Sequence, residues 1–152
     1  MTNITNKKYT NNETFEDRLK TLNLFIDGKI ANYHTDVSSD LGFERTIFVS
    51  KLKAFYLHGK SLIGSALEIN PNFAPKALRY YAQLTDKIII WTMKNVIKFI
   101  HPIANPTKSE KICVVAVGGY GRSEMAPFSD IDLLFITPYK QTAWGESVIE
   151  SI

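Results

Sequence analysis

The sequence predicts an α+β fold in which a helical region of about three helices is followed by two short strands. Apolar residues recur at three- and four-residue intervals through residues 15–100, which is typical of amphipathic helices. Two short runs rich in β-branched residues follow, Ile112–Val117 and Ile131–Ile136. Because both runs are continuously apolar, we expect strands that are covered on both faces. The composition, with 45% hydrophobic and 22% charged residues among 152, is that of an ordinary globular domain.

Three helices are expected before the strands. The first spans about Phe15 to Phe25, with a stop signal at Asp27-Gly28. The second spans Gly42 to Ile69 and ends at Asn70-Pro71-Asn72, since proline disfavours helix in the residue before it. The third spans Pro75 to Ile100, and proline suits its first turn.

These patterns divide the chain into four parts. We expect a disordered tail over residues 1–12, the helical region over 13–100 and a linker over 101–110 that contains two prolines. Residues 111–152 then form the start of a second, incomplete domain, whose last stretch from Thr142 onward is expected to begin a helix. No repeat is apparent.

Charge and cysteine content exclude several classes of protein. The formal net charge of +3 gives no argument for a nucleic-acid or membrane partner. The single cysteine, Cys113, excludes an internal disulfide, and its place in an apolar run predicts a buried, unreactive thiol. No apolar stretch is long enough for a signal peptide or a membrane span. We therefore expect a cytoplasmic protein without nucleic-acid or membrane partners.

Two aspartates at the start of the second run are the strongest candidates for chemistry. If Asp130 and Asp132 begin a strand, its period of two places both carboxylates on one face. Adjacent carboxylates repel each other unless a cation neutralises them, and oxygen ligands without histidine or cysteine favour Mg²⁺ or Mn²⁺. Asp130 and Asp132 are therefore the candidate metal ligands and catalytic residues.

A glycine-rich turn ends the first run and adds a candidate phosphate site. Gly118, Gly119 and Gly121 have no side chains, so backbone N–H groups there can approach a polyphosphate whose oxygens the metal bridges. Arg122 and Ser129 are candidate donors to the same nucleotide. Such a site catalyses phosphoryl or nucleotidyl transfer mainly by positioning and charge neutralisation.

Plainer interpretations exist for the same residues. Ser129–Asp132 also fits a solvated entry to a strand, and Gly118–Gly121 also fits a hairpin turn. An EF-hand is excluded because Phe135 stands where that loop needs glycine, and a dinucleotide fingerprint is excluded because Glu124 replaces its last glycine. The two motifs together, each beside an apolar run, favour the metal and phosphate interpretation.

The motif order from Gly118 to Leu134 resembles the nucleotidyltransferase signature of the bacterial PII-protein uridylyltransferase/uridylyl-removing enzymes. The flanking stretches Ala104–Thr107 and Lys140–Glu146 are also similar to that family. The resemblance implies a polymerase-β-like fold that transfers UMP from UTP to a tyrosine of the PII nitrogen-regulatory protein and releases pyrophosphate. It further implies that Asp130 and Asp132 bind the catalytic metals and that the Gly118-Gly119 turn faces the nucleotide phosphates.

The chain departs from the family pattern in two respects. Ser123 stands where the family usually has a further glycine. Relatives also carry the rest of the catalytic domain, with a third acidic residue on a later strand, then a phosphohydrolase domain and two ACT domains, whereas only Glu146 and Glu150 follow Asp132 here. We therefore expect an N-terminal fragment that is inactive alone. The alternatives are a non-catalytic helical binding fragment or remnant, and a related adenylyltransferase.

Overall fold

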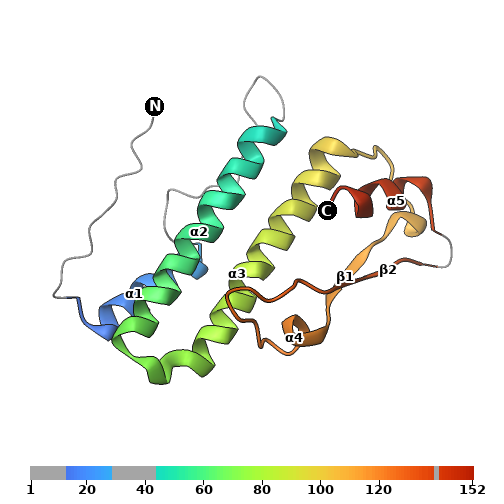
Figure 1. Ribbon diagram of the computed structural model, residues 1–152. Helices are drawn as coiled ribbons and strands as arrows, with labels where there is room; N and C mark the ends of the chain where they lie inside the picture. The colour runs from blue at the N-terminus through green and yellow to red at the C-terminus, as the bar shows by residue number, and fades with distance from the viewer. Residues whose placement is uncertain (1–12, 29–43, 139–140) are drawn as a thin grey trace.

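The computed structural model describes residues 13–28, 44–138 and 141–152 and is mostly helical, with one small antiparallel sheet (Figure 1). The helices are α1 (Phe15–Ile26), α2 (Arg45–Ile69), α3 (Ala74–Asn95), α4 (Gly118–Gly121) and α5 (Ala143–Glu150). The strands are β1 (Cys113–Ala116) and β2 (Leu133–Ile136). The predicted α+β class is confirmed at this level. The expected tail over residues 1–12, the predicted helix start at Gly42 and Lys140 lie outside the described residues.

The first helix begins and ends where local chemistry predicts. The Thr14 hydroxyl oxygen accepts a hydrogen bond from the Asp17 backbone N–H at 3.2 Å, and the Asp17 side chain accepts in return from the Thr14 backbone. At the other end Gly28 has a φ of 73°, a left-handed conformation that stops the helix.

The two long helices differ from their predicted bounds in detail. Within the described residues α2 begins at Arg45. A 3-10 helix over Pro71–Phe73 joins it to α3. The end of the predicted third helix, Val96–Ile100, is a π-helix closed by a 2.8 Å bond from the His101 N–H to the Val96 carbonyl oxygen.

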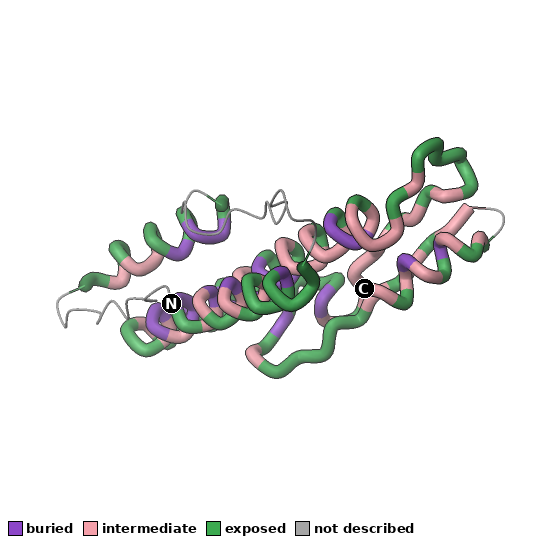
Figure 2. Tube along the Cα trace, turned by 90° about the horizontal axis from the view of Figure 1, so that it is seen from above, coloured by how far each residue is buried: buried purple, intermediate pink, exposed green. Residues whose placement is uncertain are grey.

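Helices α1, α2 and α3 pack into a bundle with an aromatic core. The Phe25 ring stacks on Phe55 with centroids 4.5 Å apart, and Phe55 in turn lies 4.4 Å from the Trp91 ring. Gly59 permits close packing of α2 on α3, because a Cβ there would lie 2.6 Å from a Leu84 methyl carbon. Buried residues concentrate along these packed helices (Figure 2).

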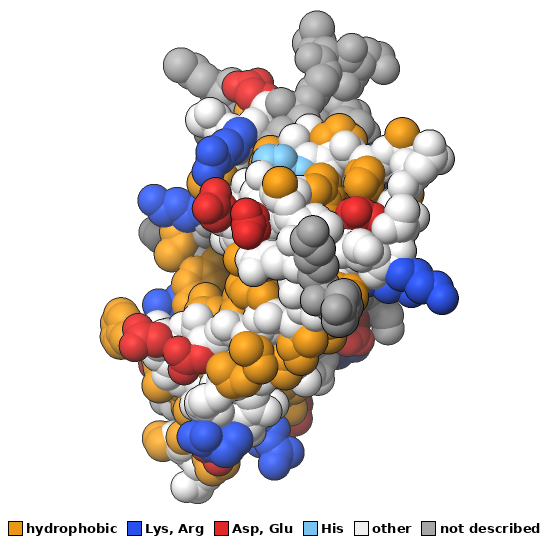
Figure 3. All heavy atoms as spheres, turned by 90° about the vertical axis from the view of Figure 1, so that its right-hand side faces the viewer, with side chains coloured by type: hydrophobic (Ala, Val, Ile, Leu, Met, Phe, Trp, Pro, Cys, Tyr) orange, Lys and Arg blue, Asp and Glu red, His pale blue; other side chains and the backbone are white. Residues whose placement is uncertain are grey.

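The strands pair antiparallel, with Cys113 opposite Ile136 and Ala116 opposite Leu133. Ala116 and Leu133 pack against the bundle core, but no strand residue is fully buried. The expectation of strands covered on both faces is therefore wrong, and so is the expected burial of Cys113, which is exposed. An apolar run in the sequence shows which side chains favour burial, but it does not show which other segments pack over them. Apolar side chains accordingly reach the surface on the side that carries α5 (Figure 3).

Helix α5 and the residue after it are hydrogen-bonded to His101, at the end of the helical region. The Trp144 indole N–H of α5 donates to the His101 carbonyl oxygen at 2.8 Å, and the His101 ring bonds the Ser151 hydroxyl at 2.8 Å. The predicted linker contains a 3-10 helix, Lys108–Glu110. Over the described residues, no helix has the length and apolar character to cross a bilayer.

Candidate functional site

The glycine turn is a single helical turn, α4, that follows β1 directly. Gly118 enters it with a φ of 59°, where a Cβ is disfavoured. Gly121 approaches the end of the strand so closely that a Cβ would lie 2.5 Å from the Ala116 carbonyl oxygen. The geometry therefore requires glycine at both positions. The turn is helical and opens a long connection between two antiparallel strands, so it is not a tight hairpin turn.

Ser123 carries an unusual backbone conformation just after this turn. Its φ is 58°, and it is the single non-glycine residue with positive φ in the described parts of the chain. The Ser123 N–H donates to the Tyr120 carbonyl oxygen at 2.9 Å, which closes the turn. The departure from the glycine of the family pattern thus falls where glycine is the least strained residue.

The two aspartates precede the second strand. The expectation that Asp130 and Asp132 begin it is wrong, since β2 starts at Leu133. The Val117 N–H still bonds the Asp132 carbonyl oxygen at 3.1 Å, but the left-handed Gly118 then turns the first strand into α4 and the ladder ends. Both aspartates are exposed.

The structure brings the glycine turn and the second aspartate side by side. A Cβ built on Gly118 would lie 2.6 Å from the Asp132 carboxylate oxygen Oδ2. Any side chain at this position would therefore displace the carboxylate. This contact joins two motifs that the sequence separates by a whole loop.

Ser129 and Arg122 have partners within the loop. The Ser129 hydroxyl oxygen accepts from the Ala126 N–H at 2.8 Å, so it stabilises the turn that leads to Asp130. The Arg122 Nε–H donates to the Glu124 carboxylate at 2.9 Å, and both side chains are exposed. An exposed ion pair contributes little, so it holds the guanidinium weakly.

The donor set fits Mg²⁺ or Mn²⁺. Both prefer oxygen ligands, and Mg²⁺ is commonly bound by one or two carboxylates together with waters and substrate phosphates. Asp132 supplies an exposed carboxylate beside the Gly118 backbone, and Asp130, also exposed, lies two residues before it in the same segment. In residues 13–28, 44–138 and 141–152, no cluster of three or more histidine, cysteine or acidic residues is placed to hold a metal. Neither Glu146 nor Glu150 is therefore placed to supply a third carboxylate ligand beside Asp130 and Asp132.

The sequence analysis missed two contacts that tie this loop to the bundle. The buried Tyr120 donates its hydroxyl proton to Asp86 Oδ1 on α3 at 2.6 Å. Burial raises the pKa of the Tyr120 hydroxyl far above its ordinary value, and the Asp86 carboxylate raises it further. The Lys60 ammonium on α2 donates to the Pro127 carbonyl oxygen at 3.1 Å and lies over the Phe128 ring. No local signal reveals pairs so distant in sequence.

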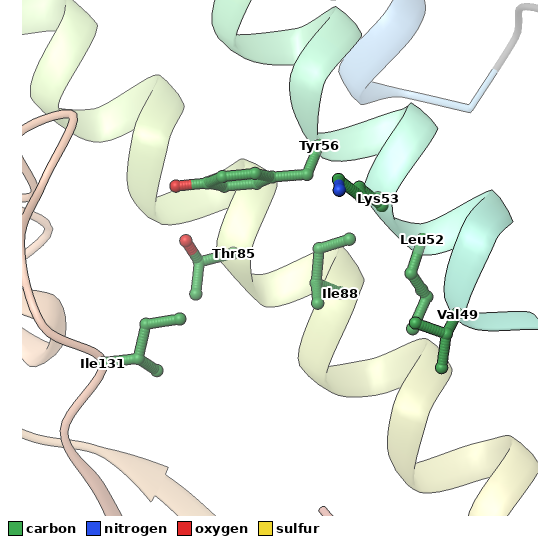
Figure 4. A pocket seen from close by; sticks show the side chains of 7 residues that line it. All are labelled: Val49, Leu52, Lys53, Tyr56, Thr85, Ile88 and Ile131. Carbon is green, nitrogen blue, oxygen red and sulfur yellow. The ribbon is translucent and has the colours of Figure 1, made fainter.

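A groove of about 330 Å³ lies between α2, α3 and the loop (Figure 4). Its lining is almost entirely apolar, and Ile131, the residue between the two aspartates, forms one side of it. The remaining lining residues are Val49, Leu52, Lys53, Tyr56, Thr85 and Ile88. The Ile131 side chain thus faces the groove on the bundle, although it is 46% exposed.

A glycine turn beside Asp132, with the exposed Asp130 two residues before it, defines a candidate metal and phosphate site. The chain is 51% identical to the bifunctional uridylyltransferase/uridylyl-removing enzyme of Ruegeria pomeroyi over 94 residues, which are 62% of this chain and 10% of that enzyme. It is 44% identical over 108 residues to the enzyme of the same name from Cereibacter sphaeroides, covering 71% of this chain and 12% of the relative. The Rhodopseudomonas palustris enzyme is 55% identical over 67 residues, which are 44% of this chain and 7% of the enzyme.

These identities confirm the resemblance to the uridylyltransferase/uridylyl-removing enzymes. The chain spans about a tenth of the length of these curated relatives, at 10% and 12% for the first two. No family model matches the chain. No solved structure matches it.

Proposed function

We propose that the chain is the N-terminal part of a uridylyltransferase that transfers UMP from UTP to a tyrosine of the PII nitrogen-regulatory protein in the cytoplasm. The observation that carries the proposal is the close approach of the Gly118 backbone to the Asp132 carboxylate. A Cβ built on Gly118 would lie 2.6 Å from Asp132 Oδ2. This approach places the bare backbone of Gly118 beside a candidate metal ligand. The names of the relatives support the choice of UMP as the transferred group.

In the proposed reaction, each group in the loop has a separate role. Asp130 and Asp132 would hold Mg²⁺ or Mn²⁺, which would supply positive charge to neutralise the triphosphate oxygens. The backbone at Gly118 and Gly119 admits the phosphates, and Gly121 keeps the turn against β1. Arg122 and Ser129 lie in the same loop and are proposed donors to the nucleotide. The acceptor hydroxyl forms a bond to the α-phosphorus as the bond to pyrophosphate breaks, and the hydroxyl proton passes to solvent.

The rest of a catalytic domain is part of the proposal. Residues 111–152 would form the first part of a polymerase-β-like nucleotidyltransferase domain, and residues 13–100 would precede it as a helical region. The two strands leave both outer edges without a partner strand within the described residues. Further strands would pair there in a complete domain. We therefore propose activity for the complete domain and none for the 152 residues alone.

A chimera tests this function directly. This chain replaces the matching segment of the Ruegeria pomeroyi enzyme, and transfer of label from UTP to PII is measured with Mg²⁺. We expect labelling by the chimera, and its loss by at least about a hundredfold in Asp130→Asn and Asp132→Asn. Glu146→Gln, an exposed acidic residue on α5, is the matched control and should retain activity.

Two results would overturn the proposal. One is a folded chimera that labels nothing while the unmodified relative labels PII, which would favour a non-catalytic fragment. The other is labelling from ATP in preference to UTP, which would favour an adenylyltransferase. The chain alone, assayed beside the chimera, should give no labelling.

A further inference from the structure

The loop between the two strands is hydrogen-bonded to the helical bundle at two points. Near its start, the Tyr120 hydroxyl donates to Asp86 Oδ1 on α3 at 2.6 Å. Near its end, the Lys60 ammonium on α2 donates to the Pro127 carbonyl oxygen at 3.1 Å. The two halves of the candidate site flank these points in sequence, because Gly118 precedes the first and Asp130 follows the second.

The Tyr120 attachment consists of packing and one directed hydrogen bond. The ring is 5% exposed and belongs to the same core cluster as Phe55 and Leu84, so its packing alone holds α4 near the bundle. The hydroxyl adds a bond to a carboxylate, which is shorter and stronger than a bond between neutral groups. This bond fixes the direction of the ring and therefore the rotation of the one-turn helix that carries it.

Rotation of α4 matters because of what lies at its first residue. The Gly118 backbone approaches the Asp132 carboxylate so closely that no side chain fits between them. A small rotation of α4 would change this spacing, and with it the space shared by the carboxylate and a phosphate. Asp86 itself lies on α3, a long helix anchored by Leu84 and Thr85, both almost fully buried.

We propose that Asp86 is a positioning residue for the nucleotide site: through the Tyr120 hydroxyl it holds the glycine turn at the spacing from Asp132 that a metal–triphosphate complex requires. This inference rests on the proposed function and extends it to the helical region. The helical bundle then determines the position of the loop. The Lys60 contact holds the other end of the loop in the same way.

The test uses the chain itself with Mn²⁺ and UTP, followed by NMR line broadening at the Gly118 and Asp132 amides. Asp86→Ala and Tyr120→Phe each remove the bond, and should raise the Mn²⁺–UTP concentration for half-broadening about tenfold. Asp86→Asn retains an acceptor oxygen. Its Mn²⁺–UTP concentration for half-broadening should therefore stay within about threefold of that of the unsubstituted chain. Lys60→Met retains the apolar stem and should weaken broadening at Asp132.

Tyr80→Phe is the matched control. Its hydroxyl donates to Asn23 Oδ1, also at 2.6 Å, but at the α1–α3 contact away from the loop. We expect a similar change in melting temperature for Tyr80→Phe and Tyr120→Phe, but altered Mn²⁺–UTP broadening for Tyr120→Phe alone.

The outcomes separate this inference from the proposed function. Broadening that is unchanged in Asp86→Ala and Tyr120→Phe, or equally weakened in Tyr80→Phe, overturns the positioning role and leaves the proposed function standing. A Mn²⁺–UTP concentration in Asp86→Asn as high as in Asp86→Ala also overturns it. Absence of broadening in the unsubstituted chain also overturns the positioning role, whereas the proposed function is decided separately by labelling of PII in the chimera.

Discussion

The helical bundle and the segment from β1 to α5 bury their apolar residues to very different extents. Leu22, Phe25 and Leu84 of the bundle are at most 1% exposed, whereas Leu134 and Ile136 of β2 are 49% and 50% exposed. Three apolar side chains of the second segment, Tyr120, Met125 and Val148, are buried, and the first two belong to the core cluster of the bundle. The difference teaches that the bundle contains its own core, while the candidate site is stable only where it docks on that core.

The largest expected effect is on the bundle core. Phe55→Ala should lower the free energy of unfolding by about 3–5 kcal/mol, because a large buried ring is lost and a cavity remains. Phe55 is 2% exposed and contacts both Phe25 and Trp91. Urea unfolding followed by circular dichroism measures this change.

Leu57→Ala is the control for that substitution, since Leu57 lies on the same helix but is 54% exposed. Its effect should stay within about 0.5 kcal/mol. Equal losses for the two variants would show that the bundle does not depend on its aromatic core.

A second pair of variants compares a glycine of the site with one of the bundle. Gly121→Ala should destabilise the protein by about 1–3 kcal/mol, because the new Cβ meets the Ala116 carbonyl oxygen at 2.5 Å and backbone must move. Gly64→Ala on α2 meets nothing within 4 Å and should stabilise the protein by about 0.5–1 kcal/mol. Thermal unfolding of both variants shows whether each substitution raises or lowers the stability of the protein. A stabilising Gly121→Ala would contradict the close approach of α4 to β1.

Acid should weaken the bundle through His58. Burial lowers the pKa of its imidazole, which lies edge-on to the Phe25 ring with centroids 5.0 Å apart. The unfolded chain therefore binds a proton at higher pH than the native chain does. This contribution to stability is present above the ordinary histidine pKa and is lost as pH falls through it.

The free energy of unfolding, measured between about pH 7.5 and 5.5, should fall less steeply in His58→Gln than in the unsubstituted chain. An equal slope in both proteins would contradict burial of the imidazole.

The smallest expected effect is at the turn itself. Ser123→Gly should stabilise the protein by about 0.5 kcal/mol, because relief of a left-handed serine exceeds the entropy cost of glycine. Ser61→Gly on the exposed side of α2 should destabilise it by a similar amount, since glycine disfavours helix. Melting temperatures that shift in the same direction for both variants would contradict the strain assigned to Ser123.

The helices could be predicted because their signals are local. The first was expected over Phe15–Phe25 and spans Phe15–Ile26, since Asp27 and Gly28 end it through their own backbone conformations. The strands were placed to within a few residues by their apolar runs. Their exposure could not be predicted, because cover depends on segments distant in sequence, and Cys113 is exposed for this reason.

The candidate site was predictable in composition and not in geometry. The motifs identify Gly118 and Asp132, but their contact depends on the left-handed conformation of Gly118. This conformation turns the chain out of β1 and ends its pairing with β2. The hydrogen bond from Tyr120 to Asp86 spans 34 residues and involves an aspartate with no motif around it. Such pairs are set by how α3 packs, which no local pattern records.

The placement of the two tryptophans gives each region its own optical reporter. Trp91 lies in the bundle against Phe55, and Trp144 of α5 bonds the His101 carbonyl oxygen at the far end of α3. Replacing either one by phenylalanine leaves a single emitter in the other region. The fluorescence of the two single-tryptophan proteins therefore distinguishes one cooperative transition from an early release of the strands and α5 from an intact bundle.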